Sequence, residues 1–121
     1  MKDALVEFGI ADSDGALATS LVVVRSQNIS TGDVVLYTSS DDGKGFCQVW
    51  FHACIGRRTV SCISRWPLVD RPRRNVLKVR HESNPHIIET EMLEVPLVYA
   101  NASEGSLATV LLPSQYQTFL D

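Results

Sequence analysis

Residues 46–66 read FCQVWFHACIGRRTVSCISRW, and this stretch predicts an antiparallel β-hairpin. Both halves are rich in β-branched and aromatic residues, as strands usually are. Gly56 and Arg57 stand between the two halves, and a glycine at the first position of a two-residue turn is typical of type II′. The hairpin is therefore expected to turn at Ile55-Gly56-Arg57-Arg58.

The position of the turn fixes the register, which places Cys62 opposite Phe51 and Ile63 opposite Trp50. Because side chains alternate across a strand, the hairpin residues divide into two faces. The face expected in the core contains Cys47, Val49, Phe51, Ala53, Val60, Cys62, Ser64 and Trp66. The face expected to be half covered contains Gln48, Trp50, His52, Cys54, Thr59, Ser61, Ile63 and Arg65.

Further short runs of strand-forming residues occupy most of the chain, with turn residues between them. Several short strands at intervals of roughly 8 to 12 residues favour a mainly β fold, a small barrel or sandwich of antiparallel strands. Helix is expected only as a turn over Thr90–Leu93, capped by the Thr90 hydroxyl, and as a short segment over Gln115–Leu120. The other strands are expected at Ala4–Ala11, Leu17–Ser26, Asp33–Thr38, Val76–Val79, His86–Ile88, Pro96–Tyr99 and Leu107–Leu112, with an extended connection over Pro67–Pro72.

The size and composition of the chain predict one globular domain over residues 1–121. The chain has 121 residues, of which 45% are hydrophobic and 21% charged, and domains of about this length can bury a core of their own. Three cysteines make an odd number, which favours reduced thiols over a disulfide framework. The acidic residues near the N-terminus disfavour a signal peptide, and the apolar runs are too short to span a membrane. The expectation is an intracellular protein without a membrane segment.

Charge is distributed unevenly along the sequence. Residues 57–80 contain seven arginines and one lysine against Asp70, a net charge of 8 − 1 = +7. The remaining residues carry 3 − 13 = −10, which recovers the −3 of the whole chain. Such a polarised domain can attract a polyanion or an acidic partner to one side.

Residues 32–99 resemble the bromo-adjacent homology domain, a β-rich module. The matching pieces are Gly32–Tyr37, Cys47–Trp50, Ile63–Trp66 followed by Arg71-Pro72, and Ile88–Tyr99. The resemblance implies a non-catalytic platform that binds histone tails, nucleosomes or other proteins. This chain departs from the family pattern between Trp66 and Arg71, where four residues intervene, and the family's binding residues are not carried over.

Candidate sites for metal binding and nucleophilic catalysis can be drawn within the hairpin. Cys47, His52, Cys54 and Cys62 offer zinc ligands, but their spacing matches no zinc finger or ribbon, and alternation divides them between the two faces. Cys54, His52 and Ser61 share a face, but no carboxylate is near in sequence to orient the histidine. Neither a metal nor another cofactor is expected.

The basic segment is the strongest candidate for a binding site. Arginines on exposed turns can bind phosphates or carboxylates with two parallel hydrogen bonds, and a neighbouring tryptophan can add a stacking contact. The residues expected to bind nucleic acid or an acidic protein partner are Arg57, Arg58, Arg65, Arg71, Arg73, Arg74 and Trp50.

Two classes of function therefore stay open. The favoured one is a non-catalytic interaction module that presents a basic face, residues 57–80, to nucleic acid or to an acidic protein. The alternative is a small ligand-binding or hydrolytic barrel whose mouth contains His52, His81 or His86 together with carboxylates. The sequence leans towards binding without catalysis, since no catalytic motif is present.

Overall fold

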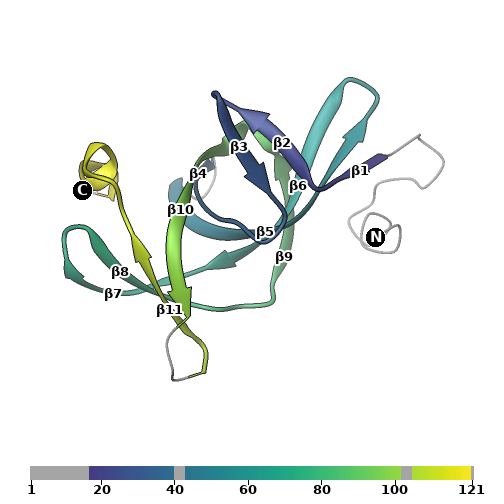
Figure 1. The fold of residues 1–121 in the computed structure, drawn as a ribbon. Coiled ribbons are helices and arrows are strands. Elements are labelled where there is room, and N and C mark those ends of the chain that lie inside the picture. The colour runs from purple at the N-terminus through teal and green to yellow at the C-terminus, as the bar shows by residue number, and fades with distance from the viewer. Residues whose placement is uncertain (1–16, 40–42, 102–104, 121) are drawn as a thin grey trace.

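Eleven strands and two 3-10 segments form the described part of this computed structural model, which covers residues 17–39, 43–101 and 105–120 (Figure 1). The predicted mainly β fold is confirmed. The strand predicted at Ala4–Ala11 lies outside the described residues. The elements are β1 (Leu17–Thr19), β2 (Leu21–Val24), β3 (Gln27–Ser30), β4 (Val34–Ser39), β5 (Gly43–Ile55), β6 (Arg58–Trp66), β7 (Leu68–Arg73), β8 (Val76–Arg80), β9 (Pro85–Glu89), η1 (Thr90–Met92), β10 (Leu93–Asn101), β11 (Leu107–Leu111) and η2 (Ser114–Leu120).

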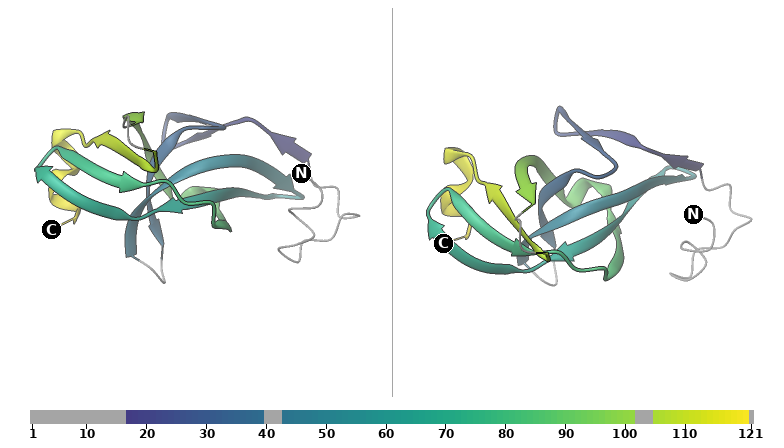
Figure 2. Two further views of the ribbon diagram at one scale, coloured as in Figure 1. Left: turned by 90° about the horizontal axis from the view of Figure 1, so that it is seen from below. Right: turned by 60° about the horizontal axis from the view of Figure 1, so that its bottom comes forward.

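Nine of the strands form one antiparallel sheet. Its order is β7-β8-β11-β10-β4-β5-β6-β9, and β1 pairs with the end of β5 beyond the part paired with β4. The described strands at the two ends of this order, β7 and β9, do not pair with each other, so the sheet curves without closing into a barrel (Figure 2). Strands β2 and β3 form a separate two-stranded sheet.

The predicted hairpin is present as β5 and β6. Cys54 pairs with Thr59 and Phe51 with Cys62, as expected. Gly56 has φ of +62° and Arg57 does not have a positive φ, which is consistent with type II′.

The register of the hairpin shifts at Trp50, however, so the prediction that Ile63 faces Trp50 is wrong. Ile63 pairs with Val49, and a bulge leaves Trp50 as the additional residue of β5. One additional residue reverses the alternation of side chains. The predicted division of β5 into two faces therefore holds only between the bulge and the turn.

The bulge allows β5 to contribute side chains to three buried clusters. Phe46 joins the largest cluster together with Leu36, Trp66 and Leu77. Cys47 and Val49 belong to a second cluster that lies under β2 and β3, and Ala53 belongs to a third. Phe51, which was expected in the core, is half-buried beside the third cluster.

The single strand predicted over Leu17–Ser26 is divided into β1 and β2. Thr19 Oγ1 donates to Leu21 O at 3.0 Å and accepts from Leu21 N at 3.4 Å, and such local bonds compete with a continuous ladder. Arg25 and Ser26 then form the β2–β3 turn with φ of +52° and +66°. Both central residues of a type I′ turn have positive φ, so the chain reverses at this point.

The connection predicted over Pro67–Pro72 is the strand β7, which forms a hairpin with β8. Two register shifts interrupt its pairing with β8, and β7 is an edge strand, where a proline is tolerated. The predicted Thr90 cap is also wrong, because the hydroxyl makes no capping bond and instead contacts Ser61 Oγ at 2.7 Å.

Candidate functional site

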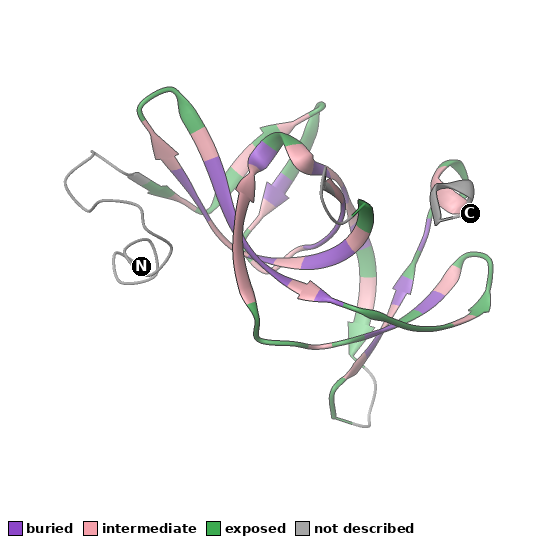
Figure 3. Ribbon diagram, turned by 180° about the vertical axis from the view of Figure 1, so that it is seen from behind, coloured by how far each residue is buried: buried purple, intermediate pink, exposed green. Residues whose placement is uncertain are grey.

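The basic residues predicted to share one face are divided between the two ends of the molecule. Arg57 and Arg58 occupy the tip of the β5–β6 hairpin, whereas Arg73 and Arg74 occupy the tip of the β7–β8 hairpin. These tips lie at opposite ends of the ribbon, and both are exposed (Figures 1 and 3). Residues 57–80 therefore present two separate basic regions.

At the β5–β6 tip, the two arginines differ in their partners. Arg58 Nη2 donates to the Glu89 carboxylate, so part of its charge is compensated. Arg57 is exposed and contacts no partner among the described residues. Among the described residues of this tip, Arg57 is therefore the uncompensated cation.

In the β7–β8 hairpin, Arg71 has a structural role. Its guanidinium donates to Arg74 O, at 3.2 Å from Nε and 3.0 Å from Nη2, and to Gln117 O at 2.8 Å from Nη2. These bonds close the hairpin and attach η2 to it. Arg71 is thus less available to a ligand than the sequence indicated.

Three other cations of this hairpin are exposed on the side of the sheet that faces away from the largest cluster. On β8, Leu77 and Val79 are buried, so Lys78 and Arg80 point outward. Arg73 pairs with Val76 and lies on the same outward side. The charged groups of Arg73, Lys78 and Arg80 form no hydrogen bond or ion pair within residues 17–39, 43–101 and 105–120. Asp70, the register partner of Lys78, adds one carboxylate to this side.

Apolar side chains continue this surface onto the next two strands. Leu111 of β11 pairs with Val76 and is 46% exposed, and Val98 of β10 pairs with Leu111 and is 69% exposed. The alternate residues Val110 and Leu97 are buried. We call this outward surface the basic face, defined by Arg73, Val76, Lys78, Arg80, Val98 and Leu111.

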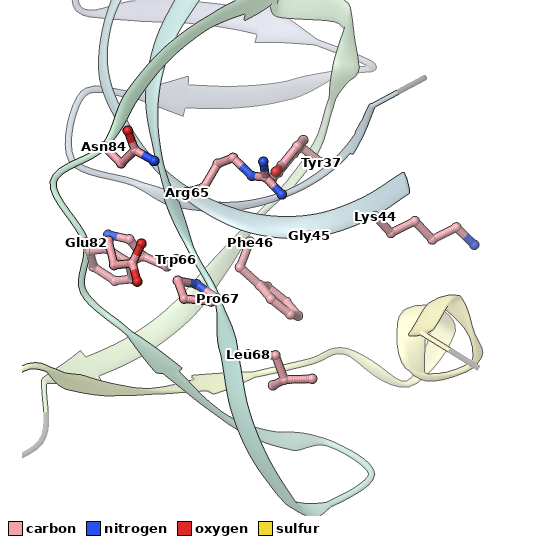
Figure 4. Close-up of a pocket in the computed structure, with 10 residues that line it drawn as sticks. All are labelled: Tyr37, Lys44, Gly45, Phe46, Arg65, Trp66, Pro67, Leu68, Glu82 and Asn84. Atoms are coloured by element: carbon pink, nitrogen blue, oxygen red, sulfur yellow. The ribbon is translucent and has the colours of Figure 1, made fainter. Parts of the chain in front are cut away.

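Arg65 lies elsewhere, in a pocket of about 420 Å³ at the end of β6 (Figure 4). The Arg65 side chain lies beside Tyr37, while the Lys44 side chain points away from the Tyr37, Phe46 and Trp66 rings. Gly45 faces the Tyr37 ring so closely that an added Cβ would lie 3.2 Å from Tyr37 Cε1. The lining residues are Tyr37, Lys44, Gly45, Phe46, Arg65, Trp66, Pro67, Leu68, Glu82 and Asn84.

The pocket wall formed by residues 81–84 is held in place by three contacts. The buried Ser64 hydroxyl donates to Glu82 O and accepts from Asn84 N at 3.2 Å. His81 stacks on Trp66 with a centroid distance of 4.3 Å. Sequence reasoning missed this pocket because its residues come from four separate segments and form no local motif.

Trp50, predicted to assist the basic segment, does not join either arginine pair. It is the half-buried residue of the β5 bulge, and its predicted partner Ile63 is fully buried.

The His52 and Ser61 pair predicted as a candidate nucleophilic site is present, but in the interior. Both residues are 0% exposed. His52 Nε2 lies 3.0 Å from Ile29 O, which can only accept, so this nitrogen donates and Nδ1 accepts from Ser61 Oγ at 2.7 Å. Burial lowers the pKa of His52, against the smaller opposing effects of the Ile29 carbonyl and Asp33. His52 is therefore a neutral core residue that binds β3 to the main sheet, and not part of a mouth.

The cysteines differ in accessibility. Cys47 and Cys62 are buried, and Cys54 is half-buried with Sγ 3.9 Å from Thr59 Oγ1. Burial raises the pKa of the Cys47 thiol well above its usual range. Among the described residues no three histidine, cysteine or acidic side chains are grouped as a metal site would require.

The search for similar proteins gave no match to a known protein family, a curated protein or a solved structure. Within the described part of the chain, no helix is both long and apolar enough to cross a lipid bilayer.

Proposed function

We propose that this chain is a non-catalytic binding module whose basic face binds an acidic surface of a partner protein. The observation that carries the proposal is the set of three exposed cations, Arg73, Lys78 and Arg80, without partners among the described residues and beside exposed apolar side chains.

The charge balance of the described residues supports an anionic partner. They carry ten lysines and arginines against six carboxylates, a net charge of 10 − 6 = +4, while the rest of the chain carries 1 − 8 = −7. A local excess of one sign raises the rate at which an oppositely charged partner associates.

The composition of the basic face favours a protein over nucleic acid. Surfaces that bind single-stranded nucleic acid combine cations with exposed aromatic rings on which bases stack. The apolar residues of the basic face are aliphatic, namely Val76, Val98 and Leu111. Tyr99, which follows Val98 on β10, points to the other side and packs against the largest cluster. Aliphatic and cationic side chains together match an acidic protein surface that also has apolar residues.

A binding experiment with matched variants tests this proposal. The probes are a blocked peptide of alternating glutamate and leucine and a single-stranded DNA oligonucleotide, each titrated by fluorescence anisotropy at 50 and 200 mM salt. We expect the triple variant Arg73→Ala/Lys78→Ala/Arg80→Ala to bind the peptide at least tenfold more weakly. The control Lys44→Ala removes a cation that lies outside both the basic face and the β5–β6 tip, and it should leave the affinity unchanged.

The other outcomes refute the proposal in different ways. Tighter binding of DNA, with a salt slope of about −0.7 per phosphate contacted, would show that the partner is a nucleic acid. Equal loss in the triple variant and in Lys44→Ala would show non-specific charge attraction. No binding of either probe at 50 mM salt would show that the cations are only solvated.

A further inference from the structure

No described residue pairs with the edge of β2 that faces away from β3, and this edge lies over a groove of about 860 Å³. Among the described strands, β2 pairs only with β3. Its residues Leu21–Val24 carry no charge, and Leu21 and Val23 are 47% and 66% exposed. Natural proteins usually protect an edge with charges, a proline or a bulge, because an open edge accepts another strand. This edge has none of these protections.

The hydrogen-bonding groups of β2 divide between the two sides of the strand. Val24 and Gln27 close the two-residue turn and form a hydrogen-bonded pair, so bonds to β3 alternate along β2. Ser20 O, which accepts from Thr31 N at 2.8 Å, follows the same alternation. The N–H and C=O groups of Leu21 and Val23 consequently point away from β3. Thr19 Oγ1 bonds both groups of Leu21, which leaves those of Val23 facing the groove.

The opposite wall of the groove contains the β5–β6 tip. Two of the three arginines that line the groove have partners. Arg58 bonds Glu89, and Arg25 contacts Glu94 at 3.5 Å and donates to Glu91 O at 3.3 Å. Arg57 is the lining cation without a partner among the described residues. A ligand lying along β2 would therefore meet apolar valines on one side. On the other side it would meet the Arg57 guanidinium and the Glu91 carboxylate, neither of which has a side-chain partner among the described residues.

From this arrangement we propose that β2 binds an extended segment of a partner protein as the third strand of the β2–β3 sheet. The segment has apolar side chains at alternate positions and one carboxylate that reaches Arg57. Main-chain bonds to Val23 provide affinity that depends little on sequence, and Arg57 provides the preference for an acidic residue. This inference does not rest on the basic face, which lies at the other end of the molecule.

The test uses three peptides and the whole chain. The first probe is a blocked hexapeptide of alternating valine and threonine in which one central threonine is replaced by glutamate. The second has the same side chains with N-methylated amides on the edge facing β2, and the third has lysine in place of glutamate. We expect only the first peptide to bind well, with at least a tenfold loss for each of the other two.

Three protein variants test the same contacts by changing the protein instead of the peptide. Val23→Pro removes the N–H that faces the groove and leaves the bonds to β3, and Val23→Thr is the matched control that keeps this N–H and the branched shape. We expect at least a tenfold loss of affinity in Val23→Pro and little change in Val23→Thr. Arg57→Glu should reverse the preference between the glutamate and lysine peptides.

Readouts on the unmodified chain keep the proposal testable if Val23→Pro does not fold. On addition of the first peptide, the Val23 amide should become protected from hydrogen exchange and Cys54, which lines the groove, should be alkylated more slowly. Equal binding of the N-methylated peptide, or no binding of the first peptide at 1 mM, would overturn the proposal. The triple variant of the basic face should still bind the first peptide, so failure of one proposal is distinguishable from failure of the other.

Discussion

Acidification should destabilise this protein through His52. The ring is fully buried, Nε2 donates to Ile29 O, and Nδ1 accepts from the Ser61 hydroxyl, which in turn lies 2.7 Å from Thr90 Oγ1. A second proton on Nδ1 would oblige the Ser61 hydroxyl to rotate and accept instead of donating, and would place a charge in the core. Burial accordingly lowers the pKa of His52 in the folded state.

The sign and size of the effect follow from proton linkage. An unfolded histidine has a pKa of about 6.5 and binds a proton below that pH, whereas folded His52 stays neutral until its own lower pKa is reached. Stability is therefore greatest above about pH 6.5 and decreases as the pH falls towards the folded pKa. For one proton excluded by the fold, the loss in the free energy of unfolding between pH 7.5 and 5.5 is up to about 1.4 kcal/mol.

Urea denaturation of the parent and of His52→Gln at pH 7.5, 6.5 and 5.5 measures this loss. The variant should be less stable at pH 7.5 by about 1 to 3 kcal/mol, because Ser61 and Ile29 lose well-placed partners. It should also lack the decrease between pH 7.5 and 5.5 that is assigned to His52. Parallel pH profiles in the two proteins would refute the reasoning, since the titration would then belong to other groups.

Three further predictions concern the turn, the pocket wall and the thiols. Ser26→Gly should raise the free energy of unfolding by about 0.5 to 1 kcal/mol in urea denaturation, because glycine adopts the φ of +66° without strain; a loss of stability would contradict the type I′ assignment. Ser64→Ala should lower the free energy of unfolding by about 1 to 3 kcal/mol and increase hydrogen exchange at the Asn84 amide, which a Ser64→Thr control should retain; unchanged exchange would exclude the anchoring role. Iodoacetamide at pH 8 should modify Cys54 well before Cys47 and Cys62, as peptide mass spectrometry can check, and rapid modification of Cys47 would contradict its burial.

The hairpin and the fold class could be predicted because their signals are local. Strand-forming residues on both sides of Gly56 determine the β5–β6 turn and the pairs nearest to it, such as Cys54 with Thr59. The bulge at Trp50 could not be predicted from the sequence. Strand-forming residues continue through position 50, and no local sequence signal identifies the additional residue. His52 has a different explanation: it keeps its predicted partner Ser61, and it is buried because β3 covers this face, with Ile29 O 3.0 Å from Nε2.

The candidate site was predicted less well because it depends on non-local arrangement. The charge excess of residues 57–80 is a property of the sequence, but the hairpins β5–β6 and β7–β8 carry its arginines in opposite directions. Arg71 was expected to bind a ligand and instead contacts main-chain carbonyls, one of which, Gln117 O, is distant in sequence. Only the three-dimensional structure shows which cations lie together on the basic face.

The pairing of β10 with β4 has a consequence for the speed of folding. Strands β4, β5 and β6 are consecutive and can assemble as a meander, because each turn closes a short loop. β10 must then join β4 from a distant part of the chain, and ordering such a long loop costs entropy before any contact is gained. We expect this step to limit the rate, with the β4–β5–β6 meander formed in the transition state and a refolding time of milliseconds to seconds, as in other all-β domains.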